Sequence, residues 1–120
     1  MIALFSGRFD RPHSGHIVQL VRLGKIYDKV IVPVLDYPEQ KYPVQYRVQI
    51  LRDAVGDYDR FYIFANKEHF AKITLEQIEQ YEFDIYISQN IECLRHIESL
   101  GYKIKYVDRA YDYSSSDEFK

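Results

Sequence analysis

The sequence comprises 120 residues, of which 47% are hydrophobic and 28% are charged, with a formal net charge of −2. A chain of this length can bury one core without disulfides or a metal, which predicts a single domain over residues 1–120. Scattered Lys and Arg exclude the basic stripe of a nucleic-acid binder, and a lone cysteine excludes a disulfide framework. The lack of a signal peptide or a long apolar run predicts a cytoplasmic protein with no membrane partner.

Short β-rich segments alternate with helix-like segments along the chain, without an internal repeat or an inter-domain linker. Strands are predicted at Ile2–Ser6, Lys29–Leu35, Arg60–Ala65, Phe83–Ser88 and Tyr102–Val107. Helices are predicted at His16–Tyr27, Gln45–Val55, Thr74–Tyr81 and Ile91–Leu100, and a last one is predicted to begin near 114–116. This alternation predicts an α/β, three-layer Rossmann-like domain with a five-stranded parallel sheet flanked by helices.

Three residues are expected to mark boundaries or irregularities. Gly24 is expected to end the regular part of the first helix early, and Gly101 to stop the fourth helix. Pro33 suggests an edge position or a bend near the end of the second strand.

In such sheets, ligands bind at the carboxyl ends of the strands, near a switch in strand order. The loops that are expected to carry the chemistry therefore follow Phe5, Leu35, Ala65, Ser88 and Val107.

The first of these loops, Gly7–His16, joins the first strand to the first helix. A helix start offers free backbone N–H groups and a partial positive charge, which suit a phosphate. Gly7 lets the backbone turn close to a ligand, and Gly15 lets a phosphate approach the helix entry. Arg8 and Arg11 add fixed positive charge at the same mouth.

Two histidines stand three positions apart at this helix entry, so His13 and His16 can both point at one phosphate. Imidazole donates a hydrogen bond when neutral and carries charge when protonated. Two loop histidines taken alone are more often surface residues than catalysts. The His-x-Gly-His spacing between a strand and a helix favours function, because nucleotidyl transfer needs positioning and stabilisation of charge on equatorial oxygens.

On these residues, Gly7–His16 resembles the first signature of the HxGH nucleotidyltransferase superfamily. Its members include glycerol-3-phosphate, choline-phosphate and ethanolamine-phosphate cytidylyltransferases, pantetheine-phosphate adenylyltransferase and nicotinamide-mononucleotide adenylyltransferases. The Gly-x-Phe-Asp-x-x-His-x-Gly-His pattern is similar to the cytidylyltransferases, whereas the Gly-Arg-Phe start is similar to the nicotinamide-mononucleotide branch. The resemblance implies that His13 and His16 are catalytic. It also implies a set of nucleotide-binding residues: Ser6, Gly7, Arg8, Phe9, Asp10 and Gly15.

A second signature of the family lies near the end of the chain, where cytidylyltransferases carry an arginine and a hydroxyl-rich run before a helix. Within Arg109–Ser116, the arginine and the hydroxyl run match in register, and the interior does not. The resemblance implies that Arg109 is catalytic and that Ser114, Ser115 and Ser116 bind the β- and γ-phosphates. Hydroxyls at a helix start also form an anion site on physical grounds, although a serine run near a terminus is by itself more often a loose tail.

The middle of the chain supplies further candidates. Family members carry a lysine after the second strand and an arginine on the next helix, which implies a catalytic role for Lys41; a solvated surface lysine is the alternative. Arg47 is expected to be structural, pairing with an acidic group near the sheet. After the fourth strand, relatives usually carry a Gly-Asp or Arg-Gly pair. This chain instead has Ser88, Gln89 and Asn90, which are predicted to bind the nucleotide, with amides that could read a base edge.

These residues predict a nucleotidyltransferase that moves CMP from CTP to a phosphorylated small-molecule acceptor and releases pyrophosphate. The acceptor oxygen would attack the α-phosphorus in line, with Mg²⁺ bound through the nucleotide triphosphate and no metal site on the protein itself. An adenylyltransferase that uses ATP is the alternative. A non-catalytic nucleotide-binding protein is a third reading, favoured by the altered interior of Arg109–Ser116. Relatives are commonly dimers, so a homodimer is expected.

Overall fold

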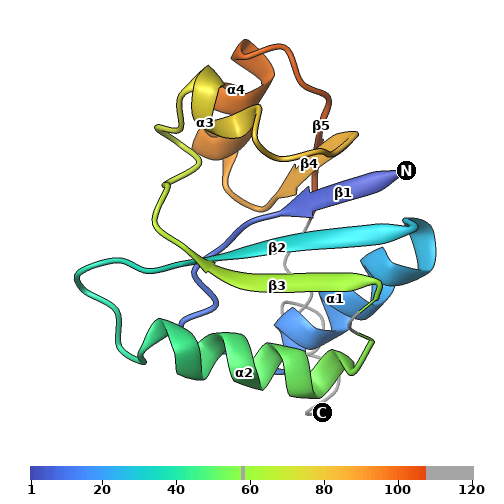
Figure 1. The fold of residues 1–120 in the computed structure, drawn as a ribbon, viewed down its shortest axis with the longest axis vertical. Coiled ribbons are helices and arrows are strands. Elements are labelled where there is room, and N and C mark those ends of the chain that lie inside the picture. The colour runs from blue at the N-terminus through green and yellow to red at the C-terminus, as the bar shows by residue number, and fades with distance from the viewer. Residues whose placement is uncertain (58, 108–120) are drawn as a thin grey trace.

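Five parallel strands form one sheet in the order β3-β2-β1-β4-β5 in this computed structural model, which describes residues 1–57 and 59–107 (Figure 1). The strands are β1 Ile2–Phe5, β2 Lys29–Leu35, β3 Phe61–Asn66, β4 Ile85–Ser88 and β5 Ile104–Tyr106. The helices are α1 Ser14–Ile26, α2 Val44–Val55, α3 Leu75–Ile78 and α4 Ile91–Ser99. All neighbouring strands in this sheet pair in parallel, so the predicted fold class is confirmed.

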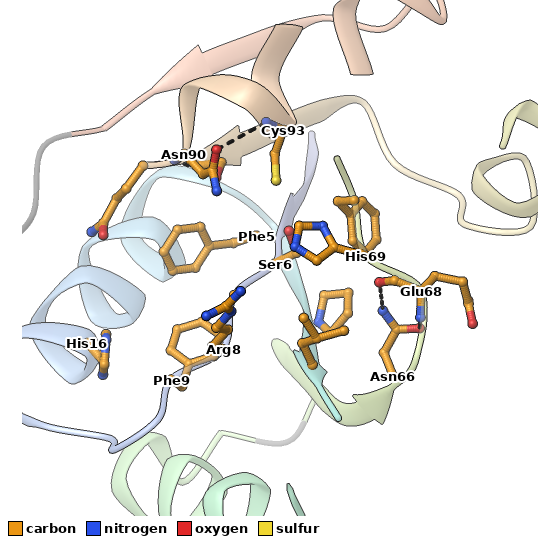
Figure 2. A pocket seen from close by; sticks show the side chains of 16 residues that line it. Phe5, Ser6, Arg8, Phe9, His16, Asn66, Glu68, His69, Asn90 and Cys93 are labelled. Atoms are coloured by element: carbon orange, nitrogen blue, oxygen red, sulfur yellow. Dashed lines mark hydrogen bonds between the residues drawn. The ribbon is translucent and has the colours of Figure 1, made fainter. Parts of the chain in front are cut away.

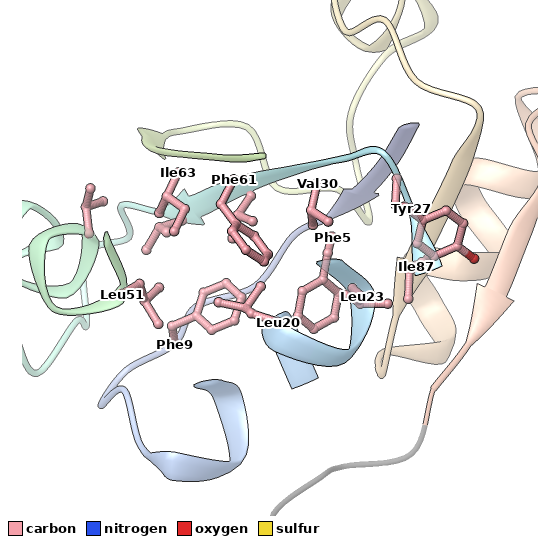
Figure 3. Close-up of a cluster of buried hydrophobic side chains, with 14 of the residues drawn as sticks. Phe5, Phe9, Leu20, Leu23, Tyr27, Val30, Leu51, Phe61, Ile63 and Ile87 are labelled. Atoms are coloured by element: carbon pink, nitrogen blue, oxygen red, sulfur yellow. The ribbon is translucent and has the colours of Figure 1, made fainter. Parts of the chain in front are cut away.

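Helices cover both faces of the sheet, with α1 and α2 on one face and α3 and α4 on the other (Figure 1). The two faces carry separate clusters of buried side chains, because successive residues of a strand point to opposite faces. Within β1, Ala3 and Phe5 belong to the cluster that packs on α1 and α2, shown in Figure 3. Leu4 belongs to the cluster that packs on α3 and α4. The predicted three-layer arrangement follows from this alternation.

The strand order reverses between β1 and β4, which pair directly although β2 and β3 lie between them in the chain. From β1 the chain runs outward to the edge strand β3 and then returns to place β4 on the other side of β1. Helix α1 follows β1 and helix α4 follows β4, so both begin at the carboxyl edge beside this switch point. Open α/β sheets bind ligands at this position.

The structure contradicts the edge position considered for Pro33 and the early helix end expected at Gly24. Strand β2 pairs with both β1 and β3, so Pro33 does not mark a sheet edge. The Pro33 carbonyl accepts a hydrogen bond from the Gly7 N–H at 3.3 Å, so Pro33 lies inside the sheet, beside the segment that follows β1. Gly24 does not end α1, which continues to Ile26. A Cβ at Gly24 would lie 2.5 Å from the Phe61 ring, so this glycine instead allows α1 to pack closely on β3.

Two helices, α1 and α3, differ from the prediction by two residues or more at one end, and the other helix ends agree within one residue. Helix α1 begins at Ser14, two residues earlier than expected, because His13 acts as its N-cap. Helix α3 has only four residues, although Thr74 and Gln77 form the predicted capping box through hydrogen bonds of 3.1 and 3.0 Å. Gly101 follows α4 with a φ of 99°, in the left-handed region expected of a stop residue.

Candidate active site

The start of α1 is capped by its own two histidines. His13 is the N-cap residue, and its Nδ1 accepts a hydrogen bond from the Gly15 backbone N–H at 3.0 Å. The Nδ1 of His16 accepts one from the His13 backbone N–H at 3.2 Å. This is a capping box in which histidines replace the usual Ser or Thr and Glu. The structure therefore brings the two predicted catalytic histidines together and orients both rings through local bonds.

The protonation state of these rings follows from the same bonds. The His13 and His16 rings are stacked, with centroids 3.8 Å apart and an interplanar angle of 22°. Because each Nδ1 accepts a hydrogen bond, a neutral ring carries its proton on Nε2, a tautomer inferred from the partners. Burial, with a smaller contribution from His13, lowers the pKa of His16 to about 4. Burial and the Arg11 charge also lower the pKa of His13. Both rings are therefore neutral Nε2–H donors at neutral pH.

Phe9 supports this pair from the core. Its side chain is 5% exposed, and its ring lies edge-on to His16, with centroids 5.0 Å apart, and to Phe5, at 5.7 Å. Its φ of 49° lies in the left-handed region that residues other than glycine seldom adopt. A Cβ at Gly7 would lie 3.0 Å from the Phe9 ring, so Gly7 leaves room for this packing. Phe9 is thus placed to hold the His16 ring, and its contact with a nucleotide stays a prediction.

Asp10 ties the first loop to the segment after β2. Its Oδ2 accepts hydrogen bonds from the Tyr37 hydroxyl at 2.5 Å and the Lys41 backbone N–H at 2.6 Å, and its Oδ1 accepts one from the Tyr42 N–H at 3.2 Å. Burial opposes ionisation of Asp10, but these bonds and the charge of Arg47 outweigh it, so the pKa of Asp10 lies below its ordinary value. The ionised carboxylate therefore brings the backbone of Lys41 beside the first loop.

The buried side chain of Arg47 holds the same region together from α2. It is 0% exposed, and its guanidinium donates hydrogen bonds to the carbonyl oxygens of Tyr42, Arg8 and Leu35. A further bond goes to the side-chain oxygen of Gln40. Arg47 is therefore structural, as predicted, but these partners are carbonyl and amide oxygens rather than the acidic group that was expected. One buried cation thus joins the first loop, the end of β2 and the segment that leads into α2.

A cleft at the start of α1, here called the basic cleft, gathers most of the predicted phosphate-binding side chains. Its lining residues are Arg8, Phe9, Asp10, Arg11, His13, His16, Lys41, Tyr42 and Gln89. The Arg8 guanidinium carbon lies 4.7 Å from the Tyr37 ring centroid, a cation–π contact that restricts its position. The three cations Arg8, Arg11 and Lys41 outnumber the ionised Asp10 carboxylate, so this cleft presents an excess of positive charge to a ligand.

A second cleft, here called the strand-end cleft, lies beside the first among the carboxyl ends of β1 to β4 (Figure 2). It encloses about 780 Å³, part of which is open to solvent. Arg8, Phe9, His16 and Gln89 border both clefts. The other lining residues are Phe5, Ser6, Gly7, Pro33, Leu35, Asn66, Glu68, His69, Phe70, Ser88, Asn90 and Cys93. Two clefts that share a wall around His16 can hold two reactants side by side.

The segment after β3 contributes residues that the sequence analysis did not name. Its side chains in the strand-end cleft are Glu68, His69 and Phe70, next to Asn66 at the end of β3. No motif marks them, and the available signal was their position after the third strand, in a loop already expected to face the ligand. Ser6, which was predicted to bind nucleotide, lies in the same cleft with its Oγ 2.6 Å from the Tyr86 hydroxyl.

The residues after β4 serve the local structure as well as the cleft. The Oδ1 of Asn90 caps α4 by accepting hydrogen bonds from the Glu92 N–H at 2.9 Å and the Cys93 N–H at 3.3 Å (Figure 2). The Asn90 backbone N–H donates to the Ser88 Oγ at 3.0 Å. The side-chain nitrogen of Asn90 and the amide of Gln89 are the groups left to meet a base. Recognition of a base by these residues stays a prediction.

Several predictions fall outside this geometry. Arg109, Ser114, Ser115 and Ser116 lie outside the described residues, so their roles stay predictions. Across 1–57 and 59–107, no group of three or more His, Cys, Asp or Glu side chains is placed to hold a metal ion. Within the same ranges, no helix combines the length and the apolar character needed to span a bilayer.

The sequence matches one known protein family and several curated proteins. Residues 4–117 match the family model described as cytidylyltransferase-like. The chain is 33% identical over 60 residues to the phosphopantetheine adenylyltransferase of Clostridium novyi, which covers 48% of this chain and 37% of that protein. It is 37% identical over 57 residues to the protein of the same name from Stenotrophomonas maltophilia, which covers 46% and 34%. The matched part therefore spans well under half the length of these curated relatives.

Solved structures share the fold at low sequence identity. A bifunctional NMN adenylyltransferase/ADP ribose pyrophosphatase from Francisella tularensis aligns with a TM-score of 0.69 and 14% identity, over 96% of this chain and 41% of that chain. A lipopolysaccharide core biosynthesis protein from Thermoplasma volcanium aligns with a TM-score of 0.65 and 19% identity, over 91% and 97%. At such identity the likeness shows the fold alone. The family model matches nearly the whole chain and confirms the resemblance first seen in its histidine signature, so the protein belongs to the cytidylyltransferase-like family of the nucleotidyltransferase superfamily.

Proposed function

We propose that this protein transfers an adenylyl group from ATP to the phosphate of a small-molecule acceptor. The observation that carries the proposal is the stacked His13–His16 pair, whose neutral rings carry Nε2–H donors at the start of α1, in the cleft that Arg11 and Lys41 also line. Nucleotidyl transfer needs positioning and stabilisation of charge on the equatorial oxygens, and little covalent chemistry from the protein. Two oriented donors at a helix start, with cations along one side, meet both needs.

In the proposed reaction, an oxygen of the acceptor phosphate attacks the α-phosphorus in line. The bond from the α-phosphorus to the oxygen that bridges to the β-phosphate breaks, and pyrophosphate leaves with that electron pair. His13 and His16 donate hydrogen bonds from Nε2 to oxygens of the α-phosphate as charge develops there. Lys41 and Arg11 line the basic cleft and bind the β- and γ-phosphates. The acceptor phosphate is already ionised at neutral pH, so no general base is required.

A divalent metal would enter this site together with the nucleotide. The described residues offer no cluster of metal ligands, and the carboxylate of Asp10 is already bonded. A structure of the Francisella tularensis bifunctional NMN adenylyltransferase contains AMP and a manganese ion, and it aligns with a TM-score of 0.65. We propose that Mg²⁺ would bind here through the nucleotide and would supply positive charge against the leaving pyrophosphate. Arg109 and Ser114–Ser116 are proposed to hold the same phosphates.

The sequence alone favoured CTP as the nucleotide. The comparisons with known proteins support ATP instead. The curated relatives are phosphopantetheine adenylyltransferases, and a structural relative is an NMN adenylyltransferase. Phosphopantetheine and nicotinamide mononucleotide are therefore the acceptors to test first. CTP is the second candidate, because the matched family model is described as cytidylyltransferase-like and the segment Gly7–His16 resembles that branch.

Pyrophosphate release tests this function. The full chain is incubated with Mg²⁺, either ATP or CTP, and each of phosphopantetheine, nicotinamide mononucleotide, glycerol 3-phosphate and choline phosphate. Pyrophosphate is assayed, and the nucleotidylated product is identified by mass spectrometry. The proposal expects release with ATP and one acceptor, and loss of that release in His13→Asn. Release with CTP alone would establish a cytidylyltransferase instead. Binding of a triphosphate without release would favour a non-catalytic nucleotide-binding protein.

A further inference from the structure

The turn after β3 presents a third histidine to the strand-end cleft. Asn66 builds this turn, because its Nδ2 donates to the Glu68 carbonyl at 2.9 Å and its Oδ1 accepts from the Glu68 N–H at 3.3 Å. The Nδ1 of His69 accepts the Ala71 N–H at 3.1 Å. A neutral His69 ring therefore carries its proton on Nε2, at the opposite edge of the ring. The turn thus supplies the cleft with an oriented hydrogen-bond donor.

His69 shares this cleft with Arg8. Figure 2 shows the two side chains reaching into the same space, one from the segment after β3 and the other from the segment after β1. Burial lowers the pKa of His69, and the positive charges of Arg8 and Lys72 lower it further, while Glu92 opposes them. Arg8 and a protonated His69 therefore repel each other. An anion bound between them would turn this repulsion into attraction on both sides.

The carboxylate that borders this cleft does not occupy the space between the two donors. The Glu68 Oε1 lies 3.5 Å from the Tyr81 hydroxyl, at the edge of hydrogen-bond distance. Figure 2 shows the Glu68 side chain extending away from Arg8. Arg8 and His69 can therefore meet a phosphate without a neighbouring negative charge between them.

The in-line geometry of nucleotidyl transfer decides which phosphate Arg8 and His69 meet. In-line attack places the acceptor oxygen and the leaving pyrophosphate on opposite sides of the α-phosphorus. Lys41 and Arg11 line only the basic cleft, whereas His16 borders both clefts. With the α-phosphate at His16 and the leaving group in the basic cleft, the acceptor approaches from the strand-end cleft. We propose that Arg8 and His69 bind the phosphate of the acceptor, an inference that rests on the proposed nucleotidyl transfer.

This assignment names the class of acceptor and changes the role of Arg8. The acceptor is a phosphate monoester, because its dianion has enough oxygens to accept from a guanidinium and an imidazole while one oxygen attacks. Arg8, expected from the sequence to bind the nucleotide, then binds the acceptor instead. His69 is a binding residue for the second reactant, and His13 and His16 serve the first.

Histidine NMR tests the assignment on the full chain, which contains four histidines. The imidazole signals are followed during titration with methyl phosphate, the simplest phosphate monoester, with and without Mg²⁺ and α,β-methylene-ATP. We expect a saturable shift of the His69 signal and a rise in its pKa, because a bound dianion favours the imidazolium. His96 is the internal reference, because its Nε2 lies 2.5 Å from the Ile73 carbonyl oxygen and it lines neither cleft.

Two variants separate binding from local structure. His69→Asn keeps a short side-chain acceptor for the Ala71 N–H but loses the Nε2 donor, so methyl phosphate should bind about tenfold more weakly. Lys72→Ala removes a nearby cation that does not line the cleft. The affinity of this variant for methyl phosphate should stay within about twofold of wild type.

The outcomes also separate this inference from the proposed function. A His69 signal that does not respond to methyl phosphate would overturn the inference, and so would unchanged methyl phosphate binding in His69→Asn. A failure of the proposed function has another signature: the triphosphate analogue does not perturb His13 and His16, and no pyrophosphate is released with any acceptor.

Discussion

Helices α1 and α4 both begin at the carboxyl edge of the sheet, yet their first turns differ in chemistry. Helix α1 is capped reciprocally by His13 and His16, has no acidic residue in its first turn and opens onto the basic cleft. Helix α4 is capped by Asn90, whose Oδ1 takes the N–H groups of Glu92 and Cys93, and Glu92 adds a negative charge there. Backbone N–H groups at a helix start are therefore not sufficient for a phosphate site, and the side chains around them decide.

The two caps also differ in which side-chain atoms they use. A histidine that caps through Nδ1 keeps a second nitrogen on the far edge of its ring, so at α1 the groups that stabilise the helix are also the proposed catalytic donors. Asparagine is shorter, and its capping oxygen is used up by the helix itself. The comparison predicts that changes at the α1 start act mainly on turnover, and changes at the α4 start mainly on stability.

The largest expected effect is on the rate of pyrophosphate release. His13→Asn should lower this rate by about a hundredfold or more, because it removes a donor to the α-phosphate while Asn remains a good N-cap. His16→Ala should lower it by a similar factor and also destabilise the fold by about 1 kcal/mol through loss of the reciprocal cap. Initial rates measure the first effect, and urea unfolding measures the second.

Glu92→Gln at the α4 start is the matched control for these variants. It removes an exposed charge from the first turn of that helix, and its rate should stay within about threefold of wild type. A rate loss in Glu92→Gln as large as in His13→Asn would break the distinction between the two helix starts.

The next effect is on the free energy of unfolding and concerns Arg47, whose buried side chain holds the loop before α1. Arg47→Met should lower the free energy of unfolding by about 3 kcal/mol, because it leaves the bonded oxygens of Arg8, Leu35 and Tyr42 without their buried donor. Arg52→Met on the same helix removes one bond, to the Ile63 carbonyl, and should lower it by about 1 kcal/mol. Urea denaturation of both variants measures the difference. Equal losses of unfolding free energy would contradict a special structural role for Arg47.

A pH effect on stability follows from the buried ring of His16. Its pKa lies near 4 in the folded protein against an ordinary 6.5, so between these values the unfolded chain binds a proton that the folded chain does not. The contribution of His16 to the free energy of unfolding is fully present above about pH 6.5 and is lost as the pH falls toward 4, and it amounts to roughly 3 kcal/mol. Urea unfolding from pH 7 to 4 should show a smaller loss in His16→Asn than in wild type, and parallel curves would contradict the buried neutral ring.

The smallest expected effect lies at the α4 start. Asn90→Ala should lower the free energy of unfolding by about 1 kcal/mol, whereas Asn90→Asp should stay within a few tenths of wild type because a carboxylate oxygen caps the same N–H groups. The KM for the nucleotide then tests the second predicted role. If Asn90 also reads the base, KM rises in both variants, and if it only caps the helix, Asn90→Asp keeps the wild-type value.

Local patterns predicted most of the fold but not its exceptions. The apolar runs and helical spacing were enough for the strand and helix segments and the parallel sheet. The edge position for Pro33 and the helix end at Gly24 were wrong, because the usual role of each residue is local while its place here is set by a neighbouring strand. In the same way, Arg47 has carbonyl partners from three separate segments, which no sequence pattern indicates. The expected homodimer stays a prediction.

The sequence by itself determined that His13 and His16 lie together at a helix entry, because the His-x-Gly-His spacing is contiguous and local geometry brings the two side chains to one side. Only the tertiary structure decided the charge state of His16, since the Phe9 ring and the surrounding core lower its pKa. The tertiary structure also decided the strand-end cleft. Arg8 and His69 are far apart in the chain and meet because the strand order places the carboxyl ends of β1 and β3 at one edge.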